Sequence, residues 1–299
     1  MALLSFDGSG SVSVWEETLA LASRTGAKFT YFISAPFFIT RSEVTNYKVP
    51  HYPLNRSFIP WETNRAAAIA RIALVSRCLK SGHEIGGHAV GHFGGQQWEY
   101  GDWDRELKFF SNVIDTRIRS YGLSKSNYYF SMRWIRGFRA PLLEGNEAMR
   151  EALWANGYRY DASQYRRDFR LLEAALPVIP LPVLKSVRGN EICGMDWNFY
   201  SLHSGAREEP DASRLAAYED DLFQAYTNYF VKKCLGPDAK PMVTGQHFER
   251  WNQGAYWKAF VRFVYFLKTY DTEFLTYSQW LSREKNEAGK KVSLTGRPQ

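Results

Sequence analysis

The stretch ALLSFDGSGSVSVWEETLALASRTGAKFTYFI, at residues 2–33, predicts a strand, a helix and a second strand in succession. Residues 2–6 form a short apolar run that is typical of a buried strand. Apolar side chains then recur at helical spacing over residues 15–22, and Gly26 is a typical helix stop. Residues 29–33 alternate as a second strand. The succession favours an α/β fold built from βα units.

The rest of the chain repeats this alternation. Helical stripes are predicted at 68–79, 103–114, 149–153, 215–229 and 256–267, and strands at 84–85, 138, 242–244 and 274–277. Neither a repeat nor an interdomain linker interrupts the pattern, and 299 residues are normal for one α/β barrel. Residues 1–299 are therefore expected to form a single domain.

Three segments break the rhythm. Residues 38–62 contain three prolines and no periodicity, and a loop of this length commonly shapes the rim of a binding site. Residues 176–183 also contain three prolines and are expected to be extended at a sheet edge. The last segment, residues 284–299, is predicted to be a frayed polar tail.

Composition excludes several classes of protein. No run of eighteen apolar residues is present, so no membrane span is expected. The net charge is +7, but Lys and Arg are scattered and form no basic stripe, which disfavours nucleic acid as a partner. Such a charge is ordinary for a solvated surface and is also compatible with an anionic polymer. The cysteines, Cys78, Cys193 and Cys234, are too widely spaced to imply a disulfide framework.

The strongest local motif is His88-Ala-Val-Gly-His92, which follows the predicted strand at 84–85. Two imidazoles four residues apart can reach one metal ion from the same side of a turn. HxxxH pairs also arise by chance on surfaces, but the glycines around this one favour a loop at a strand end. His83 precedes the strand, and we expect a structural role for it.

Four further polar sites accompany predicted strands. Asp7 directly follows the first strand, Arg139 follows the strand at 138, and His247 follows the strand at 242–244. Asp196 and Trp197 lie shortly after Cys193 in CGMDWNF. Catalytic groups of α/β barrels collect where the strands end. Each site is ordinary by itself, but together with the histidine motif they predict one catalytic centre.

These motifs, in order, are LLSFDG with AKFTYFIS, GHEIGGHAVGH, GFRAPLLEGN with GYRYDAS, MDW and TGQHFERWNQGAY. They resemble the motifs of the polysaccharide deacetylase family (carbohydrate esterase family four), which includes chitin and peptidoglycan N-acetylglucosamine deacetylases. The resemblance covers nearly the whole chain. It implies a distorted (β/α) barrel, usually of seven strands, and one divalent transition metal, usually zinc.

The resemblance also implies residue roles. His88 and His92 would bind the metal, Asp7 would be the catalytic base, Arg139 would orient that base and His247 would be the general acid. The supporting positions are Asp196, which would tune the acid, and three substrate-binding residues. Trp197 would wall the acetyl pocket, Pro141 would contact the substrate, and the backbone N–H of Leu142 would be the oxyanion donor. Amide hydrolysis needs such an activated water, a stabilised oxyanion and a protonated leaving amine.

One position departs from the family pattern. Family members commonly carry two adjacent aspartates at the first motif, the second of which binds metal, and here the second position is Gly8. Two histidines supply only two protein ligands, whereas about three are usual for a catalytic zinc. Either Asp7 takes the ligand role, or it remains the base and a group such as Ser9 or water completes the site. Both readings stay open, with the base preferred.

Because Gly8 replaces the family's second aspartate, two other functions are kept as alternatives to deacetylation. A glycan-binding pseudoenzyme of the same fold is the nearest, and hydrolysis of a small cyclic amide is a more distant one. The substrate is expected to be a polysaccharide with N-acetylglucosamine units, with peptidoglycan slightly preferred over chitin because of the positive charge. The protein is expected either to be cytoplasmic or to have had a leader removed before Met1. The second is preferred, because members of the family act outside the cytoplasm, so an extracytoplasmic location is expected.

Overall fold

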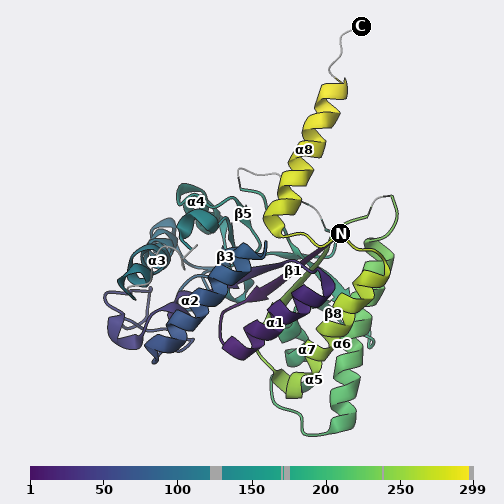
Figure 1. Ribbon diagram of the computed structural model, residues 1–299, viewed down its shortest axis with the longest axis horizontal. Helices are drawn as coiled ribbons and strands as arrows, with labels where there is room; N and C mark the ends of the chain where they lie inside the picture. Colours follow the sequence, from purple (N-terminus) through teal and green to yellow (C-terminus); the bar gives the residue numbers. More distant parts are fainter. Residues whose placement is uncertain (122–129, 170, 172–175, 238, 296–299) are drawn as a thin grey trace.

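The computed structural model describes residues 1–121, 130–169, 171, 176–237 and 239–295. Its centre is a curled sheet of six strands in the order β5-β4-β3-β2-β1-β9, in which every neighbouring pair is parallel (Figure 1). The strands are β1 (Ala2–Asp7), β2 (Phe29–Ile33), β3 (Glu84–Gly87), β4 (Gly137–Phe138), β5 (Tyr160–Asp161) and β9 (Met242–His247). The predicted α/β fold is confirmed.

The first strand–helix–strand unit forms for local reasons. The Ser11 side chain accepts a hydrogen bond from the Val14 N–H and caps α1 (Val12–Thr25). Gly26 ends the helix with φ 75°, a left-handed conformation that glycine adopts without a Cβ clash. Trp15 is fully buried on the inner face of α1, so the helix packs against the sheet as its apolar spacing predicted.

The other predicted helical stripes also form helices. They are α2 (Arg65–Lys80), α3 (Tyr100–Asn112), α4 (Glu147–Ala155), α6 (Ala212–Lys233) and α7 (Trp251–Thr269), and a short α5 (Asp196–Ser204) precedes α6. Helices α1, α2, α6 and α7 contribute buried apolar residues to one large cluster with the strands. These helices flank the sheet in Figure 1.

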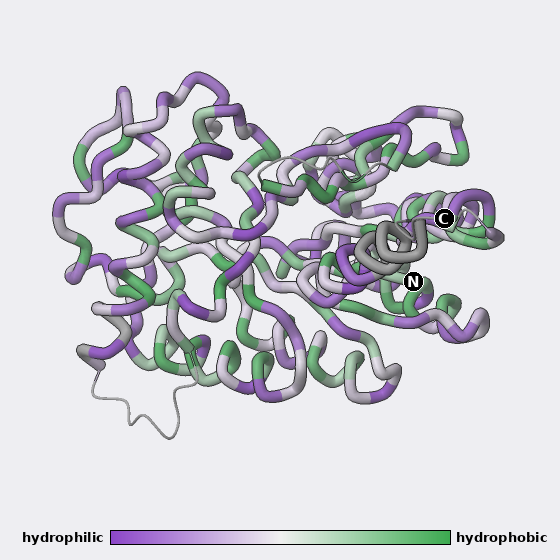
Figure 2. The backbone as a smooth tube through the Cα atoms, turned by 90° about the horizontal axis from the view of Figure 1, so that it is seen from above, coloured by the Kyte–Doolittle hydropathy of each residue, from purple (hydrophilic) through white to green (hydrophobic). Residues whose placement is uncertain are grey.

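Alternate residues of β1 face opposite sides of the sheet. Leu4 and Phe6 join the large cluster beneath the helices, whereas Leu3 belongs to a second cluster on the other face. Ser5 and Asp7 share the face of Leu3 because the side-chain period of a strand is two. The hydropathy colouring in Figure 2 shows hydrophobic segments running through the interior between more hydrophilic outer loops. Asp7 is therefore presented to the inner side of the curled sheet.

A second sheet spans the two edges of the first. It has the order β6-β7-β8, with β6 (Tyr165–Arg166), β7 (Leu181–Lys185) and β8 (Glu191–Cys193). Single bridges connect Val178 to Asp161 at the β5 edge and Met195 to Gly245 of β9. The arrangement is a distorted barrel, as predicted. Among the described residues the central sheet has six strands, so the seven strands that the resemblance implied for the barrel are not confirmed.

The placement of residues 176–183 at a sheet edge was wrong. The segment is extended and leads into β7, but β7 is the central strand of its sheet. Pro182 lacks an N–H, and its carbonyl accepts from the Gly194 N–H, just past the end of β8 (2.9 Å). The Gly194 carbonyl accepts from Gly245 of β9 instead (3.1 Å). Pro182 has no N–H to offer to the Gly194 carbonyl, and the N–H of Gly245 in β9 takes its place.

The C-terminal predictions were also wrong in part. In the predicted strand at 274–277 only Phe274 forms a bridge, to Ala2, and Tyr277 begins α8 (Tyr277–Thr295). The predicted frayed tail at 284–299 is helical through Thr295, and residues 296–299 lie outside the described residues. Arg, Glu, Lys and Ala are good helix formers even without an apolar stripe. Figure 1 shows α8 projecting away from the body of the protein.

The predicted loop at 38–62 contains neither an α-helix nor a strand of the two sheets. It has short 3₁₀ turns at Ala35–Phe38 and Arg41–Glu43, and a single bridge joins Thr40 to Glu62 near its ends. Among the described residues, no helix is long and apolar enough to cross a membrane.

Candidate active site

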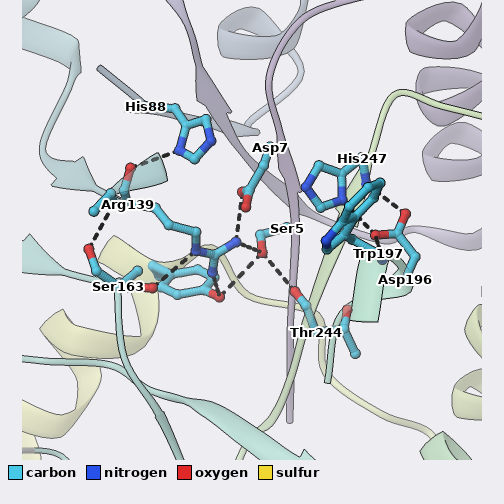
Figure 3. Close-up of polar contacts among 12 residues, drawn as sticks. Ser5, Asp7, His88, Arg139, Ser163, Asp196, Trp197, Thr244 and His247 are labelled. Atoms are coloured by element: carbon cyan, nitrogen blue, oxygen red, sulfur yellow. Dashed lines mark hydrogen bonds and ion pairs between the residues drawn. The ribbon is translucent and has the colours of Figure 1, made fainter. Parts of the chain in front are cut away.

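Asp7 and His247 are direct neighbours in the sheet. They are the last residues of β1 and β9 and stand opposite each other in the parallel register. His88 directly follows β3, two strands away, and its N–H donates to the Ile33 carbonyl at the end of β2 (2.8 Å). In Figure 3, Asp7 lies between His88 and His247. The parallel strands thus bring side chains distant in sequence to one edge.

Arg139 pairs with Asp7 inside the protein. Its Nη1 donates to Asp7 Oδ1 at 2.8 Å, and the two side chains are 0% and 2% exposed (Figure 3). Arg139 Nε donates to the Ala162 carbonyl (3.0 Å). Its guanidinium lies 4.4 Å from the ring centroid of Phe32. The guanidinium cannot turn away without losing these contacts, so it fixes the orientation of Asp7.

Two residues that sequence reasoning missed complete this pair. Arg139 Nη1 also donates to Ser5 Oγ (2.9 Å), and Nη2 donates to the Tyr277 hydroxyl (2.8 Å). Ser5 was recognisable as the residue of β1 that shares the face of Asp7. Tyr277 carried no such signal, because it belongs to a helix that the pattern had assigned to a strand. A buried charge is tolerated when its hydrogen bonds are made in this way.

His88 and His92 lie close together, with ring centroids 5.3 Å apart. His88 Nδ1 is 2.8 Å from the Arg139 carbonyl oxygen, which can only accept, so Nδ1 carries the proton and Nε2 keeps its lone pair. Burial lowers the pKa of His88 despite the nearby charge of Asp7. Burial and the repulsion of neighbouring histidines lower the pKa of His92 to about 3. Both imidazoles are therefore neutral and suited to bind a metal.

The loop that carries the two histidines is held by a buried acid. Ala89 and His92 both have φ 57°, which is unusual for residues other than glycine. Glu106 of α3 accepts hydrogen bonds from the Val90 N–H (2.7 Å) and the Gly91 N–H (3.3 Å). Sequence reasoning missed Glu106, because on the helix it was only one polar residue among several.

Tyr47 lies in the loop at residues 38–62, which we call the rim loop, and connects it to Glu106 and to the loop that carries the two histidines, the histidine loop. Its hydroxyl donates to Glu106 Oε2 (2.9 Å) and accepts from the Gly91 N–H (2.9 Å). Burial raises the pKa of Glu106 to about 7, although these hydrogen bonds oppose the change. The histidine loop, the rim loop and α3 are thus connected through one carboxyl group.

His83 lies at the opposite end of β3 from His88. Its Nδ1 accepts from the Phe29 N–H (3.1 Å), and its ring stacks on Phe29 with centroids 5.7 Å apart. Burial and the nearby Lys28 lower its pKa to about 4. A neutral, hydrogen-bonded imidazole at this place agrees with the structural role predicted for it.

The donor set fits a divalent transition metal in kind but not in number. Two neutral imidazoles are ligands that zinc prefers. A histidine that binds zinc through one ring nitrogen commonly donates a hydrogen bond from the other, and His88 Nδ1 donates to the Arg139 carbonyl in this way. Within the described ranges, however, no group of three His, Cys, Asp or Glu side chains is placed to hold a metal ion. The Ser9 hydroxyl donates to the Gly8 carbonyl. A third ligand would have to come from Asp7, water or Ser9, since a hydroxyl that donates a hydrogen bond keeps its oxygen lone pairs.

Gly8 occupies the position where the family pattern has a second aspartate. Its φ is +87°, and a Cβ built on it would meet no atom within 4 Å. Its N–H donates to the Phe32 carbonyl (2.9 Å). The position has room for a side chain, but the left-handed backbone favours glycine, with asparagine or aspartate tolerated better than most residues.

His247 is hydrogen-bonded to Asp196 at two points. The His247 N–H donates to Asp196 Oδ2 (2.8 Å), and Nδ1 lies 2.6 Å from Oδ1 (Figure 3). Burial opposes protonation of the imidazole, but the charge and hydrogen bond of Asp196, together with the charge of Asp7, raise the pKa of His247. Asp196 is the first residue of α5 and is itself buried. The pair therefore favours a protonated His247.

These residues surround a cavity of about 720 Å³. The predicted site residues that line it are Asp7, His88, His92, Leu142, Trp197 and His247. Arg139 and Asp196 lie behind the lining, where they contact Asp7 and His247. Pro141, predicted to bind substrate, is buried and does not belong to the lining. The structure thus brings the predicted set together, with Pro141 as the exception.

Leu142 and Trp197 stand at the edge of the cavity. Leu142 has φ 58°, and within the described part of the chain its N–H meets no acceptor. The Trp197 ring is 41% exposed and lies 5.1 Å from Trp251, whose ring is in turn 5.2 Å from His247. Trp251 also lines the cavity. Sequence reasoning missed it, although its place four residues after His247 was a usable signal.

The charge of the cavity differs from that of the whole chain. Its lining includes the carboxylates of Glu144, Glu191 and Glu249 besides Asp7, and no Lys or Arg among the residues described. Glu191 pairs with Arg167. Burial and the charge of Asp196 raise the pKa of Glu249, although the nearby His247 and Arg250 oppose this. The positive net charge of the chain is therefore not reflected in the Lys, Arg, Asp and Glu side chains that line the cavity.

Comparison with known proteins shows the fold. No family model matches the chain, and no curated protein matches it. Among solved structures, a putative polysaccharide deacetylase from Mycobacterium smegmatis has 15% identity and a TM-score of 0.59, with 96% of this chain and 90% of that chain covered. The peptidoglycan deacetylase PdaC from Bacillus subtilis has 11% identity and a TM-score of 0.53, with coverages of 99% and 97%.

A carbohydrate esterase family 4 pseudoenzyme from Bacillus anthracis is also similar. It has 9% identity and a TM-score of 0.50, and the match covers 93% of this chain and 64% of that chain. The likeness to all three confirms that the chain has the fold of polysaccharide deacetylases. The roles of its side chains are argued from its own geometry.

Proposed function

We propose that the chain is a member of carbohydrate esterase family 4 and that it hydrolyses the N-acetyl group of an amino sugar in a polysaccharide. The observation that carries the proposal is the convergence of Asp7, His88 and His247 from three strand ends on one cavity. Asp7 can accept a proton and His247 can donate one, and His88 together with His92 supplies two imidazoles suited to a metal. The deacetylase fold of the chain supports the same reaction class.

Asp7 is the proposed base. Arg139 holds its Oδ1, so the second carboxylate oxygen can take a proton from the attacking water. The alternative, in which Asp7 binds the metal, would compensate for Gly8. We prefer the base, because the buried ion pair with Arg139 fixes the carboxylate as a base requires.

His247 is the proposed acid. Its raised pKa keeps the imidazole protonated, and Asp196 holds the ring so that Nε2 can give its proton to the departing sugar nitrogen. The Leu142 N–H is the proposed donor to the developing oxyanion. Trp197 and Trp251 would wall the space for the acetyl group.

A divalent transition metal, proposed to be zinc, would be held by His88 and His92 and would polarise the acetyl carbonyl when bound. The incomplete protein ligand set implies weaker binding than a three-ligand site gives. His88→Ala is expected to remove metal binding and turnover together. Elemental analysis of the purified protein and of the variant measures the metal directly. Full activity of His88→Ala would show that His88 is not part of the metal site.

The substrate is proposed to be a polymer with N-acetylglucosamine units, acted on outside the cytoplasm. The slight preference for peptidoglycan rested on net charge. The acidic lining of the cavity does not strengthen it, so peptidoglycan and chitin are both retained. Incubation with purified sacculi and with chitin oligomers, followed by measurement of acetate and free amines, separates them. Activity on chitin alone would exclude peptidoglycan as the substrate.

The central test uses the same assay on variants. Asp7→Asn and His247→Ala are each expected to lower kcat by about 10²–10⁴-fold, since each removes one proton transfer. Retention of wild-type kcat by both variants would refute the proposed roles.

A glycan-binding pseudoenzyme is the second candidate, favoured by Gly8 and the missing third ligand. It predicts that chitin oligomers bind but release no acetate even with excess zinc. Gly8→Asp would then be the informative variant, because a gain of metal binding and activity would identify the lost ligand.

A further inference from the structure

The rim loop carries an exposed group of aromatic rings that the proposed chemistry does not use. Tyr52 is 41% exposed and Phe58 is 51% exposed. Both rings rest on Phe93, each with a centroid distance of 4.4 Å, and they lie 5.4 Å from each other. We call Tyr52 and Phe58 the rim patch. Leu54, between them in sequence, is also exposed.

The segment that presents the rim patch is held rigidly. The Asn55 N–H donates to the Tyr47 carbonyl (2.7 Å), and the Tyr47 N–H donates to Asn55 Oδ1 (2.9 Å), which closes the loop between them. Trp61 Nε1 donates to the Asn55 carbonyl (3.0 Å). Asn46, His51 and Asn55 all have φ of 61–64°. Such strained backbone persists where surrounding contacts impose it and is concentrated at binding sites.

The rim patch is continuous with the catalytic cavity. The Phe58 N–H donates to the Gly91 carbonyl (2.8 Å) in the histidine loop, and Phe93 directly follows His92. Ile59, the next residue after Phe58, lines the cavity. A polysaccharide that leaves the cavity beside Ile59 would therefore reach the patch.

The chemistry of the patch fits pyranose rings. Sugar rings have apolar C–H faces that pack on aromatic rings, and their edges carry hydroxyl groups that need hydrogen-bond partners. The Arg56 guanidinium lies 6.0 Å from the centroid of the Phe58 ring, so N–H donors stand beside the apolar surface. Exposed aromatics held in place at low entropic cost are well suited to bind such a ligand.

We infer that the rim patch is a second sugar-binding site, which holds a pyranose unit of the same polysaccharide outside the catalytic cavity. The inference rests on the proposed function for the identity of the polymer. The patch makes the protein selective for chain length, because short oligomers fill the cavity without reaching Tyr52 and Phe58.

The test compares the N-acetylglucosamine dimer and hexamer. Binding is measured by calorimetry and deacetylation by acetate release, for the wild type and for the double variant Tyr52→Ala/Phe58→Ala. We expect the hexamer to bind about 10-fold more weakly to the variant and its KM to rise by a similar factor, whereas kcat and all values for the dimer stay unchanged.

Two controls separate the patch from general effects. Tyr52→Phe keeps the ring and is expected to bind the hexamer as the wild type does. Tyr265→Ala removes an aromatic ring of similar exposure (43%) on α7, outside the cavity lining, and is expected to leave both oligomers unaffected.

The outcomes distinguish the two proposals. Equal hexamer binding by the wild type and the double variant overturns the rim patch, even if deacetylation is intact. Loss of hexamer binding in the variant, without acetate release by the wild type, supports the patch and contradicts the enzymatic function. A wild-type protein that binds no hexamer overturns the patch as well.

Discussion

At the residue scale, the site depends on pairs in which one side chain sets the state of another. Asp196 raises the pKa of His247, and Arg139 holds Asp7 in place. His88 donates to the Arg139 carbonyl, so Arg139 contacts both the proposed base and a proposed metal ligand. These contacts join residues more than fifty positions apart, and each sets either a proton position or a ring orientation.

Asp196→Asn tests the first pair. Without the carboxylate, the pKa of His247 is expected to fall, because the charge and hydrogen bond that raise it are lost. The protonated imidazole is the proposed acid, and activity is lost as pH rises through its pKa, so the alkaline limb of kcat/KM should move to lower pH. Proton NMR titration of His247 gives an independent value. Asp221→Asn, which alters the similar His203 pair, should leave the limb in place. An unmoved limb in Asp196→Asn would contradict the role.

Glu106→Gln tests the buried acid. Its pKa is raised from 4.5 to about 7 by burial. The folded state then keeps this proton at pH values where the unfolded chain has lost it, so the group stabilises the fold fully below pH 4.5 and progressively less up to about pH 7. As the pH rises over this range, the free energy of unfolding of the wild type should fall by about 2–3 kcal/mol relative to that of Glu106→Gln. Urea unfolding with a chelator present, at pH 5 and pH 7.5, measures the difference. If the free energy of unfolding depended on pH in the same way for both proteins, the prediction would be refuted.

At the element scale, α8 is anchored by its first turns. Tyr277, Trp280 and Leu281 are buried in the inner cluster, and Glu84 of β3 accepts from the Ser278 N–H (3.1 Å). Beyond these residues the helix projects from the body (Figure 1). The start of α8 is therefore part of the site, since Tyr277 binds Arg139.

Trp280→Ala is expected to destabilise the protein by about 3–5 kcal/mol, because it removes a large side chain that is 2% exposed. Trp154→Ala, at a position 52% exposed on α4, should change the free energy of unfolding by less than about 0.5 kcal/mol. Chemical denaturation of both variants provides the comparison. Similar values for the two would mean that the start of α8 contributes no more than a surface position.

At the scale of the whole molecule, Arg139 connects distant parts of the chain. Its side chain binds β1 through Ser5 and Asp7, the segment after β5 through Ala162, and α8 through Tyr277. The carboxylate of Asp7, the proposed base, is thus stabilised by the same contacts that hold the barrel together, which couples the geometry of the site to the fold.

Arg139→Met should cost about 3–5 kcal/mol of unfolding free energy, because it leaves Asp7 buried without a partner. The double variant Asp7→Asn/Arg139→Met removes both charges and should recover part of the loss. Urea denaturation of the single and double variants tests the coupling. A double variant no more stable than Arg139→Met would show that packing, not the unpaired charge, causes the loss.

The sequence by itself determined the βα units and the motif residues at strand ends, because apolar periodicity and helix stops are local properties. It also placed Asp7, His88 and His247 correctly at those ends. It did not determine the six-strand sheet, the central place of β7 or the start of α8, since strand pairing depends on residues far apart in the chain. Only the tertiary structure decided that Ser5, Tyr277, Glu106 and Trp251 support the site and that Glu144, Glu191 and Glu249 line the cavity. Those facts follow from side chains meeting across the barrel, and no local pattern encodes such meetings.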